Sequence, residues 1–197
     1  MDENHPTNPT NYYGYTKLAI AQNLHWYSKL KGIHYAALRY FNATGYDKDG
    51  KIKGKEKNPT NLSPLVMEVA AGIREQLQVF GNDYNTKDGT CIRDYIHVND
   101  LAIAHLKAME YIVKENKNMV LNLGTGKGNS VLEVISAAEE VVQKKIKYQI
   151  VGRREGYPEE LVASSEKARE LLGWKAQYSE LDIIFNSMKP VYLKPEK

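Results

Sequence analysis

Apolar and polar residues alternate along this chain in blocks that predict helices and strands in turn. Apolar side chains at helical spacing, together with start and stop signals, predict helices over residues 13–30, 62–74, 100–113, 131–143 and 164–172. Short apolar stretches bounded by turn residues predict strands over residues 33–41, 77–80, 95–98, 119–123 and 147–151. This alternation indicates an α/β fold with layered helices and strands.

Two kinds of residue mark the predicted helix ends. Gly32 and Gly173 each follow a helical block, and glycine ends helices readily because it adopts the left-handed backbone conformation. Asn99 or Asp100 is the predicted N-cap of the helix over 100–113, since a short polar side chain accepts a hydrogen bond from a first-turn amide. The sequence contains neither an internal repeat nor an obvious flexible linker.

Composition limits the class of protein and its partners. The chain has 197 residues, of which 42% are hydrophobic, enough to bury a core. Its 27 basic and 24 acidic residues leave a net charge of +3, which gives little reason to expect nucleic acid or a membrane surface as a partner. Because no apolar run is long enough to cross a bilayer and the start lacks a signal sequence, we expect a soluble protein.

The single cysteine, Cys91, bears on redox setting and metals. With no second cysteine the chain forms no internal disulfide, and a reducing, cytoplasmic location is expected. The five histidines are scattered and make no metal-ligand spacing with Cys91. We therefore expect no bound metal.

The strongest local signal for chemistry is a tyrosine and a lysine placed four residues apart at the head of a helix. Tyr13 and Lys17 should project from the same helix face. An ammonium close to a phenol favours the phenolate, so that Tyr13 would exchange a proton with a substrate hydroxyl. The pair also arises often by chance, and on the pattern alone a purely structural role stays open.

Four longer blocks carry a resemblance to a known family. They are NPTNYYGYTKLA, RYFNATGYD, FGNDYNTKDGTCIRDYIHVNDLA and LNLGTGKGNSVLEVI, and an RREG segment near Arg153 accompanies them. In order, and over nearly the whole chain, they resemble the UDP-glucose 4-epimerases of the extended short-chain dehydrogenase/reductase superfamily. The Tyr-x-x-x-Lys pair marks only the superfamily, whereas the DGTCIRDYIHVNDLA and RREG stretches are more specific to hexose 4-epimerases.

The resemblance implies a fold and a division into domains. The fold would be the carboxy-terminal remainder of a Rossmann-type parallel sheet plus a small α/β substrate-binding domain. Residues 1–45 and 95–124 would form the remainder of the NAD-binding domain. Residues 46–94 and 125–197 would form the domain that binds the nucleotide sugar.

The resemblance also implies the roles of individual residues. Tyr13 would be the catalytic acid and base, Lys17 would bind the nicotinamide ribose and lower the tyrosine pKa, and Tyr40 and Phe41 would line the nicotinamide end of NAD. The residues implied for the UDP-sugar are Asn42, Arg93 and Arg154 at the diphosphate, Asn61 and Leu62 at the diphosphate and uridine, and Val79 and Phe80 at the uracil. Guanidinium suits the diphosphate because its fixed fork donates two hydrogen bonds.

The implied reaction interconverts UDP-glucose and UDP-galactose. Hydride leaves C4 of the hexose for bound NAD while the Tyr13 phenolate takes the O4 proton, and the resulting 4-keto sugar swings and takes the hydride back on its other face. Binding energy should then reside in the UDP part, with few contacts to the hexose. A homodimer through the helix over 13–30 is also implied.

Two departures from the family pattern limit these expectations. Only twelve residues precede Tyr13, so the glycine-rich dinucleotide loop and the catalytic Ser or Thr that lie upstream in the family are not in this sequence. The glycine run over 124–128 follows a strand and opens a helix, but we interpret it as a backbone turn because no acidic residue ends the next strand. Tyr157 stands where the family commonly has an aspartate that touches the uridine ribose, which affects the expected substrate affinity.

These departures leave several alternatives open. The chain is expected to be part of a longer enzyme, inactive alone and doubtful in its retention of NAD. A piece that assembles with a separately encoded amino-terminal half is a second reading, and a non-catalytic module that binds UDP-sugar or dimerises is a third. An epimerase for another nucleotide sugar, such as a UDP-N-acetylhexosamine, or a 4,6-dehydratase remains a further alternative.

Overall fold

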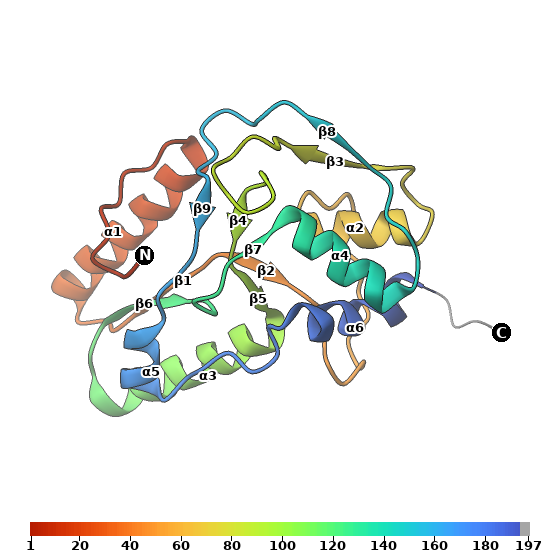
Figure 1. Cartoon of the computed structure of the whole chain (residues 1–197). Coiled ribbons are helices and arrows are strands. Elements are labelled where there is room, and N and C mark those ends of the chain that lie inside the picture. The colour runs from red at the N-terminus through yellow and green to blue at the C-terminus, as the bar shows by residue number, and fades with distance from the viewer. Residues whose placement is uncertain (194–197) are drawn as a thin grey trace.

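A computed structural model describes residues 1–193 of the chain and shows short parallel strand pairs surrounded by helices (Figure 1). The helices are α1 (Tyr12–Lys31), α2 (Leu62–Ala70), α3 (Val98–Glu115), α4 (Val131–Val142), α5 (Glu166–Leu172) and α6 (Leu181–Tyr192). The strands are β1 (Ala36–Tyr40), β2 (Asn42–Thr44), β3 (Leu77–Phe80), β4 (Ile92–Arg93), β5 (Tyr95–His97), β6 (Met119–Leu123), β7 (Asn129–Ser130), β8 (Tyr148–Val151) and β9 (Glu160–Leu161). The predicted α/β class is confirmed.

The strands pair mostly in parallel and over short lengths. β1 pairs with β6, β2 with β5 and β3 with β8, all in parallel. β4 lies between β7, which is antiparallel to it, and β9, which is parallel. Within the described residues β1 has β6 as its one neighbour, so the other edge of β1 is open. An open edge of this kind presents unpaired backbone donors and acceptors.

Two hydrophobic clusters hold the described part of the chain together. The first lies beneath α2, α4 and α6, against β3, and its fully buried side chains include Met67, Val134 and Phe185. The second lies between α3, α5 and the strands β5 and β6, with Leu121 and Trp174 at its centre. The predicted division of the chain into two domains stays a prediction.

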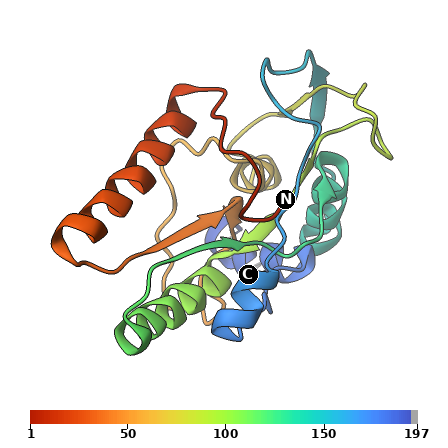
Figure 2. The ribbon, with the colours of Figure 1, turned by 90° about the vertical axis from the view of Figure 1, so that its left-hand side faces the viewer.

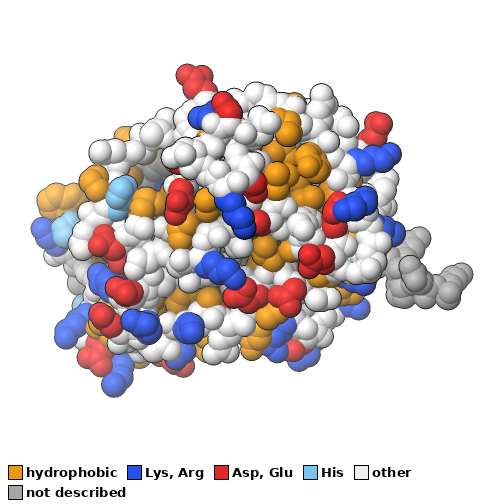
Figure 3. Space-filling view, viewed as in Figure 1, with side chains coloured by type: hydrophobic (Ala, Val, Ile, Leu, Met, Phe, Trp, Pro, Cys, Tyr) orange, Lys and Arg blue, Asp and Glu red, His pale blue; other side chains and the backbone are white. Residues whose placement is uncertain are grey.

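Helix α1 stands apart from both clusters. Asn11 caps it by accepting a hydrogen bond from the Gly14 amide at 2.8 Å, and Gly32 ends it in the left-handed conformation. None of its residues is buried, and Trp26 and Leu30 are among its exposed apolar side chains. Figures 1 and 2 show α1 at one side of the molecule, with β1 as the strand that follows it in the chain. Figure 3 shows apolar side chains exposed at this side.

Several predicted element boundaries are corrected. The strand expected over 33–41 is shorter, Ala36–Tyr40, and the helix expected over 62–74 ends at Ala70. The N-cap expected at Asn99 or Asp100 is His97, whose Nδ1 accepts from the Asn99 amide at 3.0 Å. Asp100 is unavailable as a cap because its carboxylate accepts hydrogen bonds from residues 177–179.

Helix α6 and four short strands lie outside the predicted elements. Ile184, Phe185 and Met188 recur at helical spacing and are buried, and this is the signal that predicts α6. The strands β2, β4, β7 and β9 have two or three residues each, too short for a sequence pattern to reveal. Among the described residues, no helix combines the length and apolarity needed to cross a membrane, and no group of three His, Cys, Asp or Glu is placed to hold a metal ion.

Candidate functional site

A cavity of about 140 Å³ lies between β3, the start of α2 and the loop that follows β8. We call it the β3 cavity. It is lined by Asn42, Thr60, Asn61, Leu62, Leu65, Leu77, Gln78, Val79, Phe80, Cys91, Arg93, Tyr95, Val131, Arg154 and Tyr157. Every residue predicted to bind the substrate is in this set, although these residues come from segments far apart in the sequence. The structure therefore brings the predicted substrate residues together.

Arg93 is held in place at the cavity wall by backbone carbonyls. Its side chain is buried, and Nη1 donates to the Ile92 carbonyl at 2.6 Å while Nη2 donates to the Pro158 carbonyl at 2.8 Å. No carboxylate among residues 1–193 forms an ion pair with this guanidinium. Its positive charge is thus fixed in direction and stays available to an anion.

Arg154 supplies a second positive charge to the same cavity from the loop after β8. The carbon of its guanidinium lies 3.8 Å from the centre of the Phe80 ring, a close cation–π contact. Its Nη1 donates to the Tyr157 hydroxyl at 3.1 Å, and the Tyr157 ring lies 5.8 Å from the Arg93 guanidinium. Tyr157 therefore lies close to both arginines.

The amino terminus of α2 adds to the positive potential of the β3 cavity. Asn61 occupies the N-cap position, but its side chain makes no capping hydrogen bond, and the first turn contains no acidic residue. A helix amino terminus carries a partial positive charge and presents free backbone amides. Two arginines add to this charge, and no described residue of the lining carries a carboxylate. The cavity is therefore suited to an anion that also carries an apolar or aromatic part.

Tyr13 and Lys17 line a different hollow, of about 580 Å³, which we call the α1 hollow. The Lys17 ammonium lies 5.0 Å from the centre of the Tyr13 ring, so the two side chains share one helix face. Tyr40 lines the same hollow from β1, whereas Phe41 is in the lining of neither this hollow nor the β3 cavity. The Tyr13 side chain is 71% exposed.

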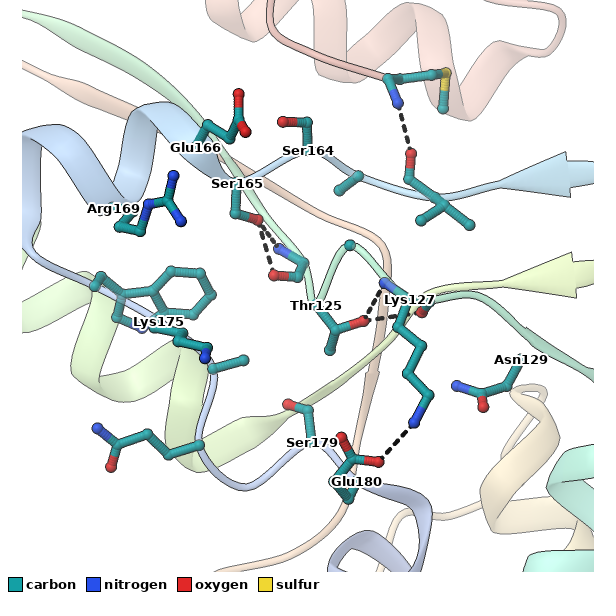
Figure 4. A pocket seen from close by; sticks show the side chains of 18 of the residues that line it. Thr125, Lys127, Asn129, Ser164, Ser165, Glu166, Arg169, Lys175, Ser179 and Glu180 are labelled. Atoms are coloured by element: carbon teal, nitrogen blue, oxygen red, sulfur yellow. Dashed lines mark hydrogen bonds and ion pairs between the residues drawn. The ribbon is translucent and has the colours of Figure 1, made fainter.

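The glycine run over 124–128 forms a turn whose amides are bound within the chain (Figure 4). Gly124 N donates to Ser165 Oγ at 2.8 Å, and Thr125 N donates to Asp94 Oδ1 at 3.0 Å. Gly126 N also donates to the Asp94 carboxylate, at 3.3 Å. The turn therefore offers a phosphate no row of free amides, unlike a dinucleotide-binding loop.

An open hollow of about 680 Å³ surrounds this turn, but its charges are balanced. Lys127 pairs with Glu180 at 2.9 Å, and Figure 4 shows Arg169 and Lys175 on the same wall as Glu166. Its lining shares no residue with the β3 cavity. Its size alone does not make it the candidate site.

Cys91 and Tyr95 line the β3 cavity and were missed in reading the sequence. They lie two residues on either side of Arg93, and side chains two apart along an extended chain share a face. This alternation is the signal that would have found them. Burial raises the pKa of the Tyr95 phenol, so the hydroxyl at this wall stays uncharged.

Known proteins with similar sequence and structure place the chain in a family. The profile of the family described as GDP-mannose 4,6 dehydratase matches residues 1–186. The UDP-glucose 4-epimerase of Halalkalibacterium halodurans is 49% identical over 183 residues, 92% of this chain and 54% of that protein. The same enzyme from Lacticaseibacillus casei is 46% identical over 188 residues, 95% of this chain and 56% of that protein. The chain thus spans about half the length of these curated relatives.

Solved structures agree with the sequence relatives. The UDP-glucose 4-epimerase of Brucella ovis in complex with NAD superimposes with a TM-score of 0.94 at 42% identity, over 98% of this chain and 59% of that chain. The enzyme from Bifidobacterium longum in complex with NAD⁺ and UDP gives a TM-score of 0.87 at 41% identity, over 95% of this chain and 56% of that chain. The resemblance to UDP-glucose 4-epimerases is confirmed, and the chain belongs to the family described as GDP-mannose 4,6 dehydratase.

Proposed function

We propose that this chain carries the UDP-sugar site of an NAD-dependent UDP-glucose 4-epimerase. The observation that supports the proposal most is the β3 cavity, in which two guanidinium groups without an ion pair to residues 1–193 face an apolar and aromatic wall. A nucleoside diphosphate has the matching chemistry, a doubly charged anion attached to a flat base. The similar enzyme from Bifidobacterium longum was solved with UDP.

The diphosphate would be held by the arginines and the start of α2. Arg93 and Arg154 donate charged hydrogen bonds to phosphate oxygens, and such bonds are stronger than neutral ones. Asn42 and Asn61 contribute amide groups beside them, since both line the same wall. Binding energy then resides in the part of the substrate that does not react.

The uridine would lie against Leu62, Val79 and Phe80, which form the apolar wall of the cavity. The present volume of about 140 Å³ is smaller than the roughly 300 Å³ at which ligand pockets begin. Residues 152–157, which are exposed and include Tyr157, would therefore move away when the ligand enters, while Pro158 keeps its hydrogen bond from Arg93. Arg154 would travel with this loop from the Phe80 ring to the diphosphate.

Proton transfer would occur at the α1 hollow, where Tyr13 faces the hexose hydroxyl and Lys17 holds a ribose of the cofactor. Tyr40 from the same hollow would face the nicotinamide, whereas the role implied for Phe41 stays a prediction because Phe41 lines neither the α1 hollow nor the β3 cavity. NAD, when bound, supplies the hydride acceptor and donor for C4. The residues at this hollow fit the nicotinamide end of NAD, whereas the amides of the glycine turn are already bound internally.

We further propose that the cofactor phosphates and the open edge of β1 are covered by a complementary segment that resembles the amino-terminal half of the relatives. The open edge supports this, because a parallel strand with one unpaired edge is stable when a neighbour or a helix covers it. A homodimer through α1, whose aromatic side chains are exposed, is the second assembly we propose. The reducing cytoplasm is the compartment in which this assembly would work.

Titration calorimetry of this chain with UDP and with NAD tests the proposal. We expect UDP to bind and NAD to bind weakly or not at all. Adding the complementary segment of a relative, fused or in trans, should then give exchange between UDP-galactose and UDP-glucose. Absence of UDP binding by the folded chain would reject the proposal.

A non-catalytic UDP-sugar-binding module is the second candidate. It is favoured by the contrast between the β3 cavity, which six segments of the chain line, and the α1 hollow, where Tyr13 is largely exposed. The same experiment separates the two functions. UDP binding without any C4 exchange in the completed protein would support the module and contradict the enzyme.

A further inference from the structure

Asp94 is a buried carboxylate that lies directly beside Arg93 but has no assigned role in binding. It is fully buried, and no cation among the described residues forms an ion pair with it. Its oxygens accept from Thr125 N at 3.0 Å, Thr125 Oγ1 at 2.8 Å, Gly126 N at 3.3 Å and Ala163 N at 3.2 Å. A buried carboxylate is tolerated only where several donors converge on it, and here they come from two separate segments.

The backbone of Asp94 ties the same point of the chain to two further segments. Its amide donates to the Leu161 carbonyl in β9 at 3.2 Å, and its carbonyl accepts from the Asn42 amide at 3.0 Å. Asn42 lines the β3 cavity. The position of Asn42 is therefore set directly by a hydrogen bond to Asp94.

The segment that Asp94 anchors is also the segment that holds Arg93. The Arg93 guanidinium donates to the carbonyls of Pro158 and Glu159, which immediately precede β9. Asp94 binds the other end of this segment, at Leu161 through its amide and at Ala163 through its carboxylate. Because successive residues of an extended chain project to opposite faces, Arg93 faces the cavity while Asp94 fixes the strand from behind.

We propose that Asp94 is a positioning residue for the diphosphate site. Its carboxylate locks the glycine turn and the segment after β9 onto β4, and this lock fixes Arg93 and Asn42 in the geometry that an incoming diphosphate meets. The inference rests on the proposed function, since it assigns the diphosphate to Arg93. It also gives the glycine turn a role, because its amides bind a carboxylate of the same chain in place of a phosphate.

The packing around Gly124 agrees with this role for the turn. A β-carbon added at Gly124 would lie 2.5 Å from Asp94 Oδ2 and 2.6 Å from the Ala163 β-carbon. Such distances are too short for any side chain. The glycine is thus required so that the backbone approaches the buried carboxylate closely.

Asp94→Asn tests the inference, with Asp100→Asn as its matched control. Asp100 is equally buried and accepts from Gln177 N, Tyr178 N and Ser179 Oγ, but these partners lie outside the β3 cavity lining, whereas Asn42, which donates to the Asp94 carbonyl, lies in it. An asparagine at either position turns an NH₂ group toward backbone donors, so both variants lose stability. Of these two variants, only Asp94→Asn should change how phosphate is bound.

The readout is the ratio of the affinities for UDP and for uridine, measured by calorimetry at a temperature where each variant is folded. We expect Asp94→Asn to reduce this ratio about tenfold through misplacement of charged hydrogen bonds, and Asp100→Asn to leave it unchanged. Thr125→Val removes the hydroxyl donor to Asp94 together with that hydroxyl's contacts to the Lys127 carbonyl and amide, and leaves the Asp94 carboxylate in place. It should reduce the ratio about twofold to threefold, and it covers the case in which Asp94→Asn fails to fold.

The outcomes separate the inference from the function on which it rests. In the first outcome the unmodified chain binds UDP, but the UDP/uridine affinity ratio of Thr125→Val, and of Asp94→Asn if it folds, equals that of Asp100→Asn. Asp94 then has no positioning role, although the UDP site stands. If the unmodified chain binds neither UDP nor uridine, the proposed function fails and the inference fails with it. If the UDP/uridine affinity ratio falls in Asp94→Asn or Thr125→Val but not in Asp100→Asn, the result supports both the proposed function and the inference.

Discussion

The β3 cavity and the α1 hollow differ in how many segments of this chain line them. Six separate segments of the chain meet around the β3 cavity, and its arginines are held by backbone carbonyls and an aromatic ring. The α1 hollow is bounded by residues 7–9, one helix and one strand, and no residue of that helix is buried. The difference indicates that the nucleotide end of the proposed substrate is recognised by surfaces within this chain, whereas the reacting end depends on surfaces that complete the α1 hollow.

The largest expected effect is on stability, and it comes from removing a side chain of the hydrophobic cluster beneath α2, α4 and α6. Phe185 is fully buried between α6 and its neighbours, so Phe185→Ala should lower the free energy of unfolding by about 3–5 kcal/mol. Trp26→Ala on α1 removes a side chain that is 57% exposed and should change it by less than about 0.5 kcal/mol. Urea denaturation followed by circular dichroism measures both, and equal losses would contradict the contrast.

The next effect concerns the cavity charges and uses two neighbouring arginines. Arg154→Ala should weaken UDP binding about tenfold to a hundredfold, because a charged hydrogen-bond donor to phosphate is lost. Arg153→Ala removes the same charge one residue earlier, but Arg153 pairs with Asp83 at 2.7 Å and stacks on Tyr84, outside the cavity lining. Calorimetry with UDP should therefore find Arg153→Ala close to the unmodified chain.

A smaller effect is the pH dependence of the free energy of unfolding, which we expect to come from a buried histidine and not from a histidine on α1. Burial lowers the pKa of His97 below its ordinary 6.5, while the Asp100 and Asp47 carboxylates act in the opposite direction. The unfolded chain then binds a proton more readily than the folded chain, so stability is fully present above about pH 6.5 and falls as the pH drops toward the folded-state pKa. Each tenfold difference in proton affinity corresponds to about 1.4 kcal/mol.

Denaturation between pH 5 and pH 8 measures this dependence. His97→Gln should flatten it, because the buried imidazole that accepts from Asn99 is gone. His25→Gln, on the exposed surface of α1, should leave it intact. If the free energy of unfolding of His97→Gln varied with pH as it does in the unmodified chain, the pH dependence would have to come from other groups.

The smallest expected effect on UDP affinity comes from a substitution in the α1 hollow. Tyr13→Phe removes a hydroxyl in the α1 hollow, and this hollow shares no lining residue with the β3 cavity. UDP affinity should stay the same, whereas C4 exchange in the completed enzyme should be lost with the proton carrier. A marked loss of UDP affinity would show that the two hollows are coupled.

The longer elements were predictable because their patterns are strong and local. The helix around Tyr13 and Lys17 and the strand over Leu77–Phe80 follow from spacing and turn residues alone. Helix boundaries such as the start of α3 were not predictable in this way. The His97 side chain caps α3, while Asp100 binds a loop almost eighty residues later. Competition between local and distant partners for one side chain cannot be seen in a local pattern.

The resemblance predicted a set of residues that the structure places at one cavity, but it did not predict their geometry. The sequence motifs implied that Arg93 and Arg154 act together, and the structure places both at one cavity. Cys91 and Tyr95 were missed there although they alternate with Arg93. The role of Asp94 has no local signal at all, because its partners lie more than thirty residues away.

By itself the sequence determined the alternation of helices and strands, the shared face of Tyr13 and Lys17 and the family resemblance, since each depends on residues close together or on motif order. Only the tertiary structure decided that the glycine turn binds a buried carboxylate, that the arginines stay unpaired within the described residues, and that β1 keeps an open edge. These features depend on which distant segments meet, and burial fixes that choice because each buried polar group must find a partner.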